Sequence, residues 1–341
     1  MGSVLDLATI YDIAKKTGFS ASTVARALNG NGYCSPKTQK KILAAADELG
    51  YMPYEAAKTL KNSITNKIML CIPDIMNPYY FAMIHGVTQT LEGYGYNVIL
   101  SYTMHSKKKE LEVLDSLRGR FVDGLIFGSF DYTPALMHAI QNTALPTVLT
   151  SYYEDSDGAD FYDCVYMDQP KAAWTATKHC LENGHTEIAF LGGNPKEQNT
   201  RERFEGYQKA MREAGLPLRE ELILTADFTR EGAHRVCRDF LQTKPACTAM
   251  VACNDLMGVG CMIACREAGL HVPEELSIVS LDNTDYCLCT DPPMTSVDMM
   301  QGPVGVEAAR FVMERILSKR NFQKNMSFSP NLILRESVQK R

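Results

Sequence analysis

Residues 8–29 read ATIYDIAKKTGFSASTVARALN, and this stretch decides how the rest of the chain is interpreted. Thr9 is of a type that caps helix N-termini, and Gly18 can take the left-handed conformation with which many helices end. Ser20 is a second capping residue, and Val24 and Leu28 give the following segment an apolar stripe at helical spacing. The stretch therefore predicts two short helices joined by a tight turn, a helix-turn-helix.

The second of these helices carries Ala21, Ser22 and Arg26 on the side away from its apolar stripe. When a helix-turn-helix binds DNA, the N-terminal half of its second helix reaches base edges in the major groove. Arg26 has the forked guanidinium that pairs with O6 and N7 of guanine. An ordinary helical hairpin with a solvated polar face would show the same pattern, so both interpretations remain open on these residues alone.

Charge is distributed unevenly along the chain. The 341 residues have a net charge of −5, which by itself argues against binding to nucleic acid. Residues 8–62 contain eight lysines and arginines against four acidic residues, a net charge of +4, so the remainder carries −9. A basic N-terminal module on an acidic body indicates contact with phosphate groups in one place only.

A third helix is predicted from Ser35, a cap that precedes a first-turn proline, to Leu49, with Gly50 as its stop. With YMPYEAAKTL at 51–60, residues 8–60 resemble the DNA-binding headpiece and hinge of the lactose-repressor (LacI/GalR) family. The resemblance implies a headpiece at 8–52 and a hinge helix and linker at 53–66. In this family a leucine of the hinge helix wedges between base pairs in the minor groove, and by position that leucine is Leu60. The predicted DNA contacts are Thr9, Ala21, Ser22, Thr23, Arg26, Asn29, Tyr54, Lys58 and Leu60.

From residue 67 onward, short runs rich in Val, Ile and Leu alternate with helical patterns of ten or more residues. Such runs are typical of buried parallel strands, and the alternation predicts a doubly wound α/β architecture. Because the runs fall into two series, two similar lobes with a cleft between them are expected. The first series is 67–73, 96–102, 122–128 and 146–152, and the second is 187–193, 221–227, 248–254 and 276–282.

This body resembles the periplasmic-binding-protein-like sensor domain of the same family. The resemblance is carried by NPYY at 77–80, RFEGYQKAM at 203–211, ACNDLMGVG at 252–260 and LILRES at 332–337. It implies an effector-binding and dimerisation domain at residues 67–341. The first lobe would span about 67–165 and 296–326, and the second about 166–295 and 327–341.

Polar and aromatic side chains follow several of the predicted strands. In open α/β sheets, ligands bind at the carboxyl ends of strands, so these side chains should converge on one cleft. Asp, Asn and Arg suit hydrogen bonding to vicinal hydroxyls or ring nitrogens, and tyrosine can stack on a ring. Structural roles remain possible: a turn cap for the aspartate, an ion pair with Glu205 for the arginine, and core packing for either tyrosine. The predicted effector contacts are Tyr79, Tyr80, Ser151, Arg203, Asn254 and Asp282.

The sequence departs from the family pattern at four positions. Ala25 stands where many members carry a serine that contacts phosphate, and Lys58 replaces a common arginine. Tyr54 replaces the asparagine or serine that begins the hinge helix, so that cap is lost. Ser151 replaces a frequent aspartate of the first lobe, which puts the usual contact to a hexose or pentose in doubt.

Other chemistry finds no support in the sequence. The chain has no G-x-S-x-G elbow and no G-x-x-x-x-G-K-[ST] loop, and its eleven cysteines lack zinc-site spacing. No catalytic residue, metal or cofactor is therefore predicted. Without a secretory signal or transmembrane run, the expected compartment is the cytoplasm.

The sequence as a whole predicts a repressor, a homodimer on a pseudo-palindromic operator, controlled by a small molecule that is a sugar or sugar derivative. A purine-type effector is the alternative for the ligand. A solute-binding protein of a transport system is the alternative for the function, although it leaves the headpiece unexplained.

Overall fold

The computed structural model describes residues 8–29, 33–51, 64–153 and 161–341. The chain divides into two compact units, Met1–Ile64 and Thr65–Arg341, and each is described by itself. Tyr54, Lys58 and Leu60, predicted above to contact DNA, lie outside the described residues.

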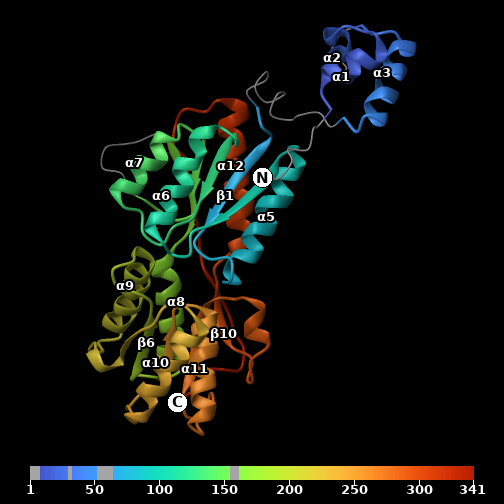
Figure 1. The fold of residues 1–341 in the computed structure, drawn as a ribbon. Coiled ribbons are helices and arrows are strands. Elements are labelled where there is room, and N and C mark those ends of the chain that lie inside the picture. The colour runs from blue at the N-terminus through green and yellow to red at the C-terminus, as the bar shows by residue number, and fades with distance from the viewer. Residues whose placement is uncertain (1–7, 30–32, 52–63, 154–160) are drawn as a thin grey trace. The chain divides into compact units, whose positions relative to one another are not determined.

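The N-terminal unit contains the predicted helix-turn-helix and one further helix. The three helices are α1 (Ile10–Thr17), α2 (Ala21–Asn29) and α3 (Pro36–Glu48) (Figure 1). Thr9 and Asp12 form a reciprocal capping box at the start of α1, and Gly18 ends this helix with φ of 78°. Ile13, Val24 and Ile42, one from each helix, are fully buried together. Three short helices are thereby held by one small shared core.

The second unit contains two sheets of six strands, as the predicted α/β fold requires. The first sheet has the order β11-β5-β4-β3-β1-β2, and all its pairings are parallel. Its strands are β1 (Lys67–Ile72), β2 (Asn97–Tyr102), β3 (Gly124–Phe127), β4 (Thr147–Leu149), β5 (Tyr162–Met167) and β11 (Asn325–Phe328).

The second sheet has the order β12-β10-β9-β8-β6-β7, with β12 antiparallel at its edge. Its strands are β6 (Ile188–Gly192), β7 (Ile223–Thr225), β8 (Ala249–Ala252), β9 (Ser277–Asp282), β10 (Thr295–Asp298) and β12 (Asn331–Ile333). The first sheet with its helices is called the first lobe, and the second sheet with its helices the second lobe.

Helices cover both faces of each sheet, which explains why most strands are apolar throughout. In the first lobe, α5 and α12 share one buried cluster with the sheet, while α6 and α7 share another. The backbones of α5 and α12 approach closely at Gly305. A Cβ added at this glycine would lie 2.4 Å from the carbonyl oxygen of Met83, so only glycine fits there. The first-lobe helices are α5 (Tyr79–Gly93), α6 (Lys107–Ser116), α7 (Pro134–Asn142) and α12 (Gln301–Ser318), and the second-lobe helices are α8 (Gln169–Glu182), α9 (Gln198–Glu213), α10 (Arg230–Gln242) and α11 (Asp255–Glu267).

The chain passes between the lobes three times: after β5, after β10 and after β11. These crossings correct the predicted lobe boundaries by a few residues. Residues 166–167 and 327–328 belong to the first sheet, because they lie in the paired strands β5 and β11. Residues 296–298 belong to the second sheet, because β10 pairs with β9. Strands β5, β10, β11 and β12 were absent from the predicted series.

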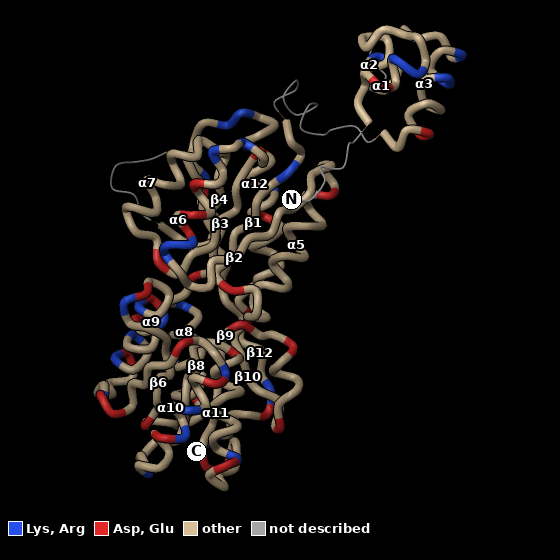
Figure 2. The backbone as a smooth tube through the Cα atoms, viewed as in Figure 1, with Lys and Arg blue, Asp and Glu red and all other residues tan. Residues whose placement is uncertain are grey.

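Two further observations concern charge and membranes. Six basic and three acidic side chains lie on the described part of the N-terminal unit, and Figure 2 shows lysines and arginines on its helices. The described residues include no helix long and apolar enough to span a lipid bilayer.

Candidate functional site

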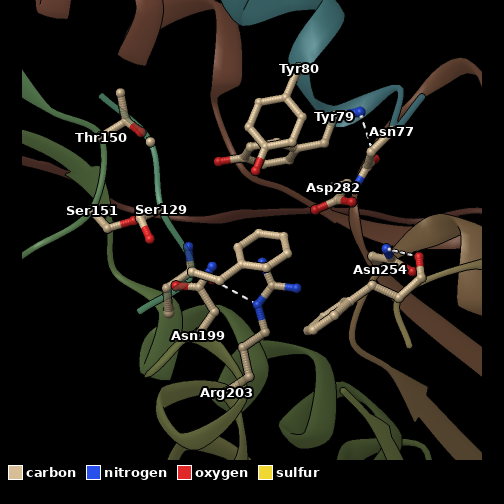
Figure 3. A pocket seen from close by; sticks show the side chains of 14 residues that line it. Asn77, Tyr79, Tyr80, Ser129, Thr150, Ser151, Asn199, Arg203, Asn254 and Asp282 are labelled. Atoms are coloured by element: carbon tan, nitrogen blue, oxygen red, sulfur yellow. Dashed lines mark hydrogen bonds between the residues drawn. The ribbon is translucent and has the colours of Figure 1, made fainter. Parts of the chain in front are cut away.

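A pocket lies between the two lobes, at the carboxyl ends of their strands, and all six predicted effector residues line it (Figure 3). Tyr79 and Tyr80 come from the start of α5, Ser151 follows β4, Arg203 lies on α9, and Asp282 ends β9. The enclosed space is about 30 Å³, enough for a water molecule but far below the several hundred Å³ of a typical ligand pocket. A sugar-sized ligand can therefore enter only if the lobes separate or side chains move.

Arg203 is held at the centre of the pocket by neutral groups. Its Nε donates to Oε1 of Gln169 at 2.8 Å, and its Nη1 donates to the carbonyl oxygen of Cys253. The side chain is only 5% exposed, and its guanidinium lies 5.8 Å from the centre of the Phe228 ring. It makes no ion pair with Glu205, because residues two apart on a helix face different directions. Arg203 lies in the second turn of α9, which begins at Gln198.

Asp282 is buried and strained, and part of its carboxylate is unpaired. The residue has φ of 117°, outside the range that side chains normally allow. Its Oδ1 is buried without a hydrogen-bond partner among the described residues. Burial raises the pKa of this carboxyl well above its usual value, and the nearby Asp255 raises it further. An unsatisfied acceptor in this position indicates a ligand site more strongly than a turn cap.

Asp255, the first residue of α11, provides the contrast. Its two carboxylate oxygens accept four hydrogen bonds from three residues, at 2.5 to 2.8 Å, and these bonds oppose the rise in pKa that burial causes. The donors are the hydroxyls of Ser280, Ser296 and Thr284 and the backbone N–H of Thr284. Asp255 therefore holds segments of the second lobe together through its hydrogen bonds. Asp282, which is 2% exposed, instead faces the pocket.

The two tyrosines have different environments. Tyr80 is 4% exposed and belongs to the buried cluster of the first lobe, so core packing accounts for it. Tyr79 is half-buried and packs against the buried clusters of both lobes. The two rings meet edge to face, with centroids 4.9 Å apart, and the Oδ1 of Asn77 accepts the backbone N–H of Tyr79 at 3.0 Å. Tyr79 is thus the tyrosine better placed to contact a ligand.

Asn254 and Ser151 complete the predicted set. The Oδ1 of Asn254 caps α11 by accepting from the backbone N–H of Met257 at 2.8 Å, and its Nδ2 donates to the carbonyl oxygen of Phe228 at 3.0 Å. These bonds give Asn254 a structural role at the pocket wall. Ser151 is half-buried beside Thr150, on the first-lobe wall of the pocket.

Several pocket residues escaped the sequence analysis. Phe130, after β3, and Phe228, after β7, bring their rings to 5.4 Å between centroids across the cleft. Close by, the backbone N–H of Asn199 donates to the carbonyl oxygen of Phe130 at 3.4 Å, and Arg201 approaches Asp131 at 3.7 Å. Both phenylalanines follow the carboxyl end of a strand, so the same rule that predicts the polar contacts applies to them.

The candidate DNA-binding residues lie on or beside α2. Ser22 and Arg26 are exposed, while Val24 is fully buried, so α2 has the predicted two faces. The hydroxyl of Ser20 lies 2.9 Å from that of Ser22 and 2.8 Å from that of Thr23. The hydroxyl of Thr9 donates to Oδ2 of Asp12 at 2.6 Å, Ala21 begins α2 and Asn29 is its last residue.

Two family models match the chain. The model described as bacterial regulatory proteins, lacI family, matches residues 9–54. The model described as a periplasmic binding protein-like domain matches residues 177–338.

Individual relatives extend over almost the whole chain. An HTH-type transcriptional repressor PurR from Photobacterium profundum is 31% identical over 333 residues, 97% of this chain and 99% of that protein. Catabolite control protein A from Priestia megaterium is 31% identical over 326 residues, 95% of this chain and 97% of that protein.

Solved structures agree in fold. A complex of the transcriptional regulator CelR with cellobiose is 27% identical, has a TM-score of 0.74, and is matched over 97% of this chain and 99% of that chain. A lac repressor dimer bound to operator and the anti-inducer ONPF has a TM-score of 0.83 at 21% identity, over 98% and 100% of the two chains. With relatives this similar across its length, the protein belongs to the lacI family of bacterial regulatory proteins.

Proposed function

We propose that this DNA-binding transcriptional regulator is a homodimeric repressor of a pseudo-palindromic operator, and that its effector is a sugar or sugar derivative bound between the two lobes. The observation that carries the proposal is the pocket with its buried Arg203 and its partly unpaired Asp282, in a chain whose N-terminal unit is a helix-turn-helix. A solute-binding protein of a transport system would have no use for that N-terminal unit.

The DNA-binding part of the proposal is supported by the two faces of α2. Arg26 is exposed and free to fork onto a guanine, while Ser22 lies one turn earlier on the exposed side of the helix. Two such helices in a dimer would read the two halves of a pseudo-palindrome. Tyr54, Lys58 and Leu60 of the hinge would contact the centre of the site, as the family resemblance implies.

The effector part is supported by the chemistry of the pocket. Asp282 offers an acceptor, Arg203 offers donors, and Tyr79 offers a ring face, which together suit a ring with several hydroxyls. Because the enclosed space is small, a ligand can enter only when the lobes separate or side chains move, and by binding it would change the balance between open and closed lobes. It can do so only through a difference in affinity for the two states.

A purine-type effector is the second candidate for the ligand. Phe130 and Phe228 face each other across the cleft, and a flat base could insert beside one of these rings. A relative named PurR, the repressor from Photobacterium profundum, is similar over nearly the whole chain. Thr150 and Ser151, the polar first-lobe residues beside Phe130, favour the hydroxyl-rich ligand.

Two measurements test the proposal. The first is fluorescence anisotropy with DNA from upstream of the gene, which should show saturable binding that competing random DNA does not abolish. The second is thermal unfolding with sugars, glycosides and purines, because a ligand that binds only the folded state raises the midpoint. A protein that responds to a ligand but never to DNA would contradict the regulator and favour a solute-binding protein.

A further inference from the structure

The chain enters the second unit through two residues that a distant carboxylate holds in place. Thr65 and Asn66 precede β1, and Asp123 precedes β3. The backbone N–H of Thr65 donates to both carboxylate oxygens of Asp123, at 2.9 and 3.0 Å, and that of Asn66 donates to Oδ2 at 2.8 Å. We call these hydrogen bonds the Asp123 clamp. Both clamped residues belong to the predicted linker 53–66, so the last part of that linker is fastened to the second unit.

The Asp123 clamp also holds a sharp turn. Asn66 has φ of 53°, in the left-handed region where asparagine is one of the few side chains that fit readily. Its carbonyl oxygen accepts the backbone N–H of Asn97 at 2.9 Å, and the backbone N–H of Asp123 donates to the carbonyl oxygen of Lys67 at 2.8 Å. The direction in which the chain reaches β1 is therefore fixed by the two neighbouring strands.

β1 does not need the Asp123 clamp in order to form. It pairs in parallel with β2 over six residues and with β3 over four. Ile68, Leu70 and Ile72 of this strand are fully buried. The two clamped amides lie before this ladder, at residues that are half-buried or exposed. Hydrogen bonds to a carboxylate are about twice as strong as those between neutral groups, so the clamp restrains a part of the chain that the core does not hold.

Three elements connect the Asp123 clamp with the pocket at the other edge of the sheet (Figure 1). β3 starts directly after Asp123 and leads to Phe130 on the pocket wall, and β1 follows the clamped residues and leads to Asn77. α5 starts at Tyr79 in the pocket, has 15 residues and is therefore about 22 Å long. After its end, the hydroxyl of Tyr96 is hydrogen-bonded to Asp123. Rigid elements of this kind can carry a change at the pocket to the clamp.

We propose that Asp123 is a positioning residue for operator binding, because it fixes where the linker leaves the second unit and thereby which spacing between half-sites the dimer accepts. The inference rests on the proposed homodimer on a pseudo-palindromic operator. Half-site spacing in a dimer is a geometric property, set by the distance between its two recognition helices. Releasing Thr65 and Asn66 would lengthen each linker by two residues, or by up to about 7 Å. This is about the rise of two base pairs, at about 3.4 Å each, so a dimer without the clamp would tolerate other spacings.

The test compares three DNA duplexes on the full-length protein by fluorescence anisotropy. Footprinting with the wild-type protein on DNA from upstream of the gene defines the native site. The second duplex has one base pair inserted at the centre of this site, and the third keeps only one half-site. Asp123→Ala removes the clamp. Asp123→Asn keeps one acceptor oxygen, so it weakens the clamp and also covers the case in which the alanine variant does not fold.

We expect Asp123→Ala to bind the native site roughly five- to thirtyfold more weakly than the wild type, because freed residues must be ordered again when both half-sites are occupied. The inserted base pair should cost the variant less affinity than it costs the wild type. Affinity for the single half-site should not change, since one DNA-binding unit needs no fixed spacing. A carboxylate with a purely structural role would instead lower all three affinities in proportion.

Asp115→Asn is the matched control. This aspartate lies on α6 of the same lobe, its side chain is 69% exposed, and it pairs with Arg118 at 3.0 Å. Its replacement removes the same negative charge, which by itself would strengthen rather than weaken binding to DNA phosphates. Amide hydrogen exchange of the peptide that contains Thr65 and Asn66 should become faster in both Asp123 variants and stay the same in this control.

Each outcome decides the inference. It is overturned if the Asp123 variants discriminate against the inserted base pair as strongly as the wild type does, or if the amides of Thr65 and Asn66 exchange no faster. It is also overturned if binding to the single half-site falls as much as binding to the native site. These failures leave specific DNA binding by the wild type, and with it the proposed regulator, intact. If the wild-type protein shows no footprint of two half-sites, the proposed function itself is contradicted and the inference fails with it.

Discussion

Replacing Asp282 with asparagine should make the unliganded protein more stable, although the residue lies at the centre of the candidate site. The substitution keeps the size and shape of the side chain and removes its ionisable group. In the wild-type protein this group is 2% exposed, and one of its oxygens has no partner in the described part of the chain. Function-related residues of this kind are retained at a cost in folding free energy.

The magnitude follows from the ionisable group. Each pKa unit by which the folded carboxyl exceeds the unfolded one costs about 1.4 kcal/mol at a pH above both values, and 1 kcal/mol corresponds to a shift of roughly 2–4 °C for a domain of this size. The variant should therefore melt a few degrees higher than the wild type. Because the carboxyl has a raised pKa when folded, its penalty is absent below the unfolded pKa near 3.8 and grows as pH rises toward the folded value. The difference between the two proteins should accordingly increase from pH 5 to pH 8.

Thermal unfolding by circular dichroism over that pH range measures the effect. Asp255→Asn is the matched control, since this equally buried acid accepts four hydrogen bonds and its replacement should lower the melting temperature. Asp282→Asn should also lose the shift that an effector produces, while DNA binding persists. If its melting temperature is unchanged or lower at every pH, Asp282 is part of the structural framework, and the reasoning from its buried ionisable group is wrong.

Three further predictions concern other parts of the molecule. Arg26→Ala should cost about 1–3 kcal/mol on the specific operator and relax the preference at one base pair; an equal loss on random DNA in the same anisotropy assay would show that Arg26 meets only phosphate. Leu60→Ala should weaken operator binding and reduce the bend measured by gel mobility, with effector affinity unchanged, and an unaltered bend would argue against a wedge. Asp131→Asn removes the 3.7 Å contact with Arg201 across the cleft and the 2.6 Å ion pair with Lys107 within the first lobe; only the former joins the lobes, and it is partly exposed and worth at most about 1 kcal/mol. Calorimetry should therefore find effector affinity lowered by less than about fivefold, and a much larger loss would mean that Asp131 touches the ligand.

The polar part of the pocket could be predicted because one rule applies to all open α/β sheets. Arg203 and Asp282 lie far apart in the sequence, yet both are near carboxyl strand ends of the second sheet, and the fold brings them to the same cleft. The rule says nothing about which oxygen is left unpaired. The contrast between Asp282 and Asp255 depends on three hydroxyl residues of other segments, and only the structure reveals it.

Strands β5, β11 and β12 could not be predicted, because their sequences lack the continuous apolar run that identifies a buried strand. β5 contains Asp163, a buried carboxylate whose oxygens accept from Arg315 at 2.8 Å and which also pairs with Arg320. A charged residue at the second position of a strand hides the buried strand in the sequence, although here two arginines from the C-terminal part of the chain compensate the charge. β11 alternates between exposed and half-buried residues, and β12 has one exposed and two half-buried residues. Both lie at sheet edges, so they lack the continuous apolar signal of a buried strand.

The placement of β11 and β12 also constrains how the protein can be made. Each lobe takes one strand from the last part of the chain, so the first sheet is complete only after Phe328 has been made and the second only after Ile333. The N-terminal unit, whose core lies entirely within the first 64 residues, can fold long before that moment. A transcript cut before Asn325 would therefore yield a protein with a DNA-binding unit but with β5 and β10 left as open sheet edges in both lobes. Such a product would aggregate or be degraded rather than act as a weakened sensor.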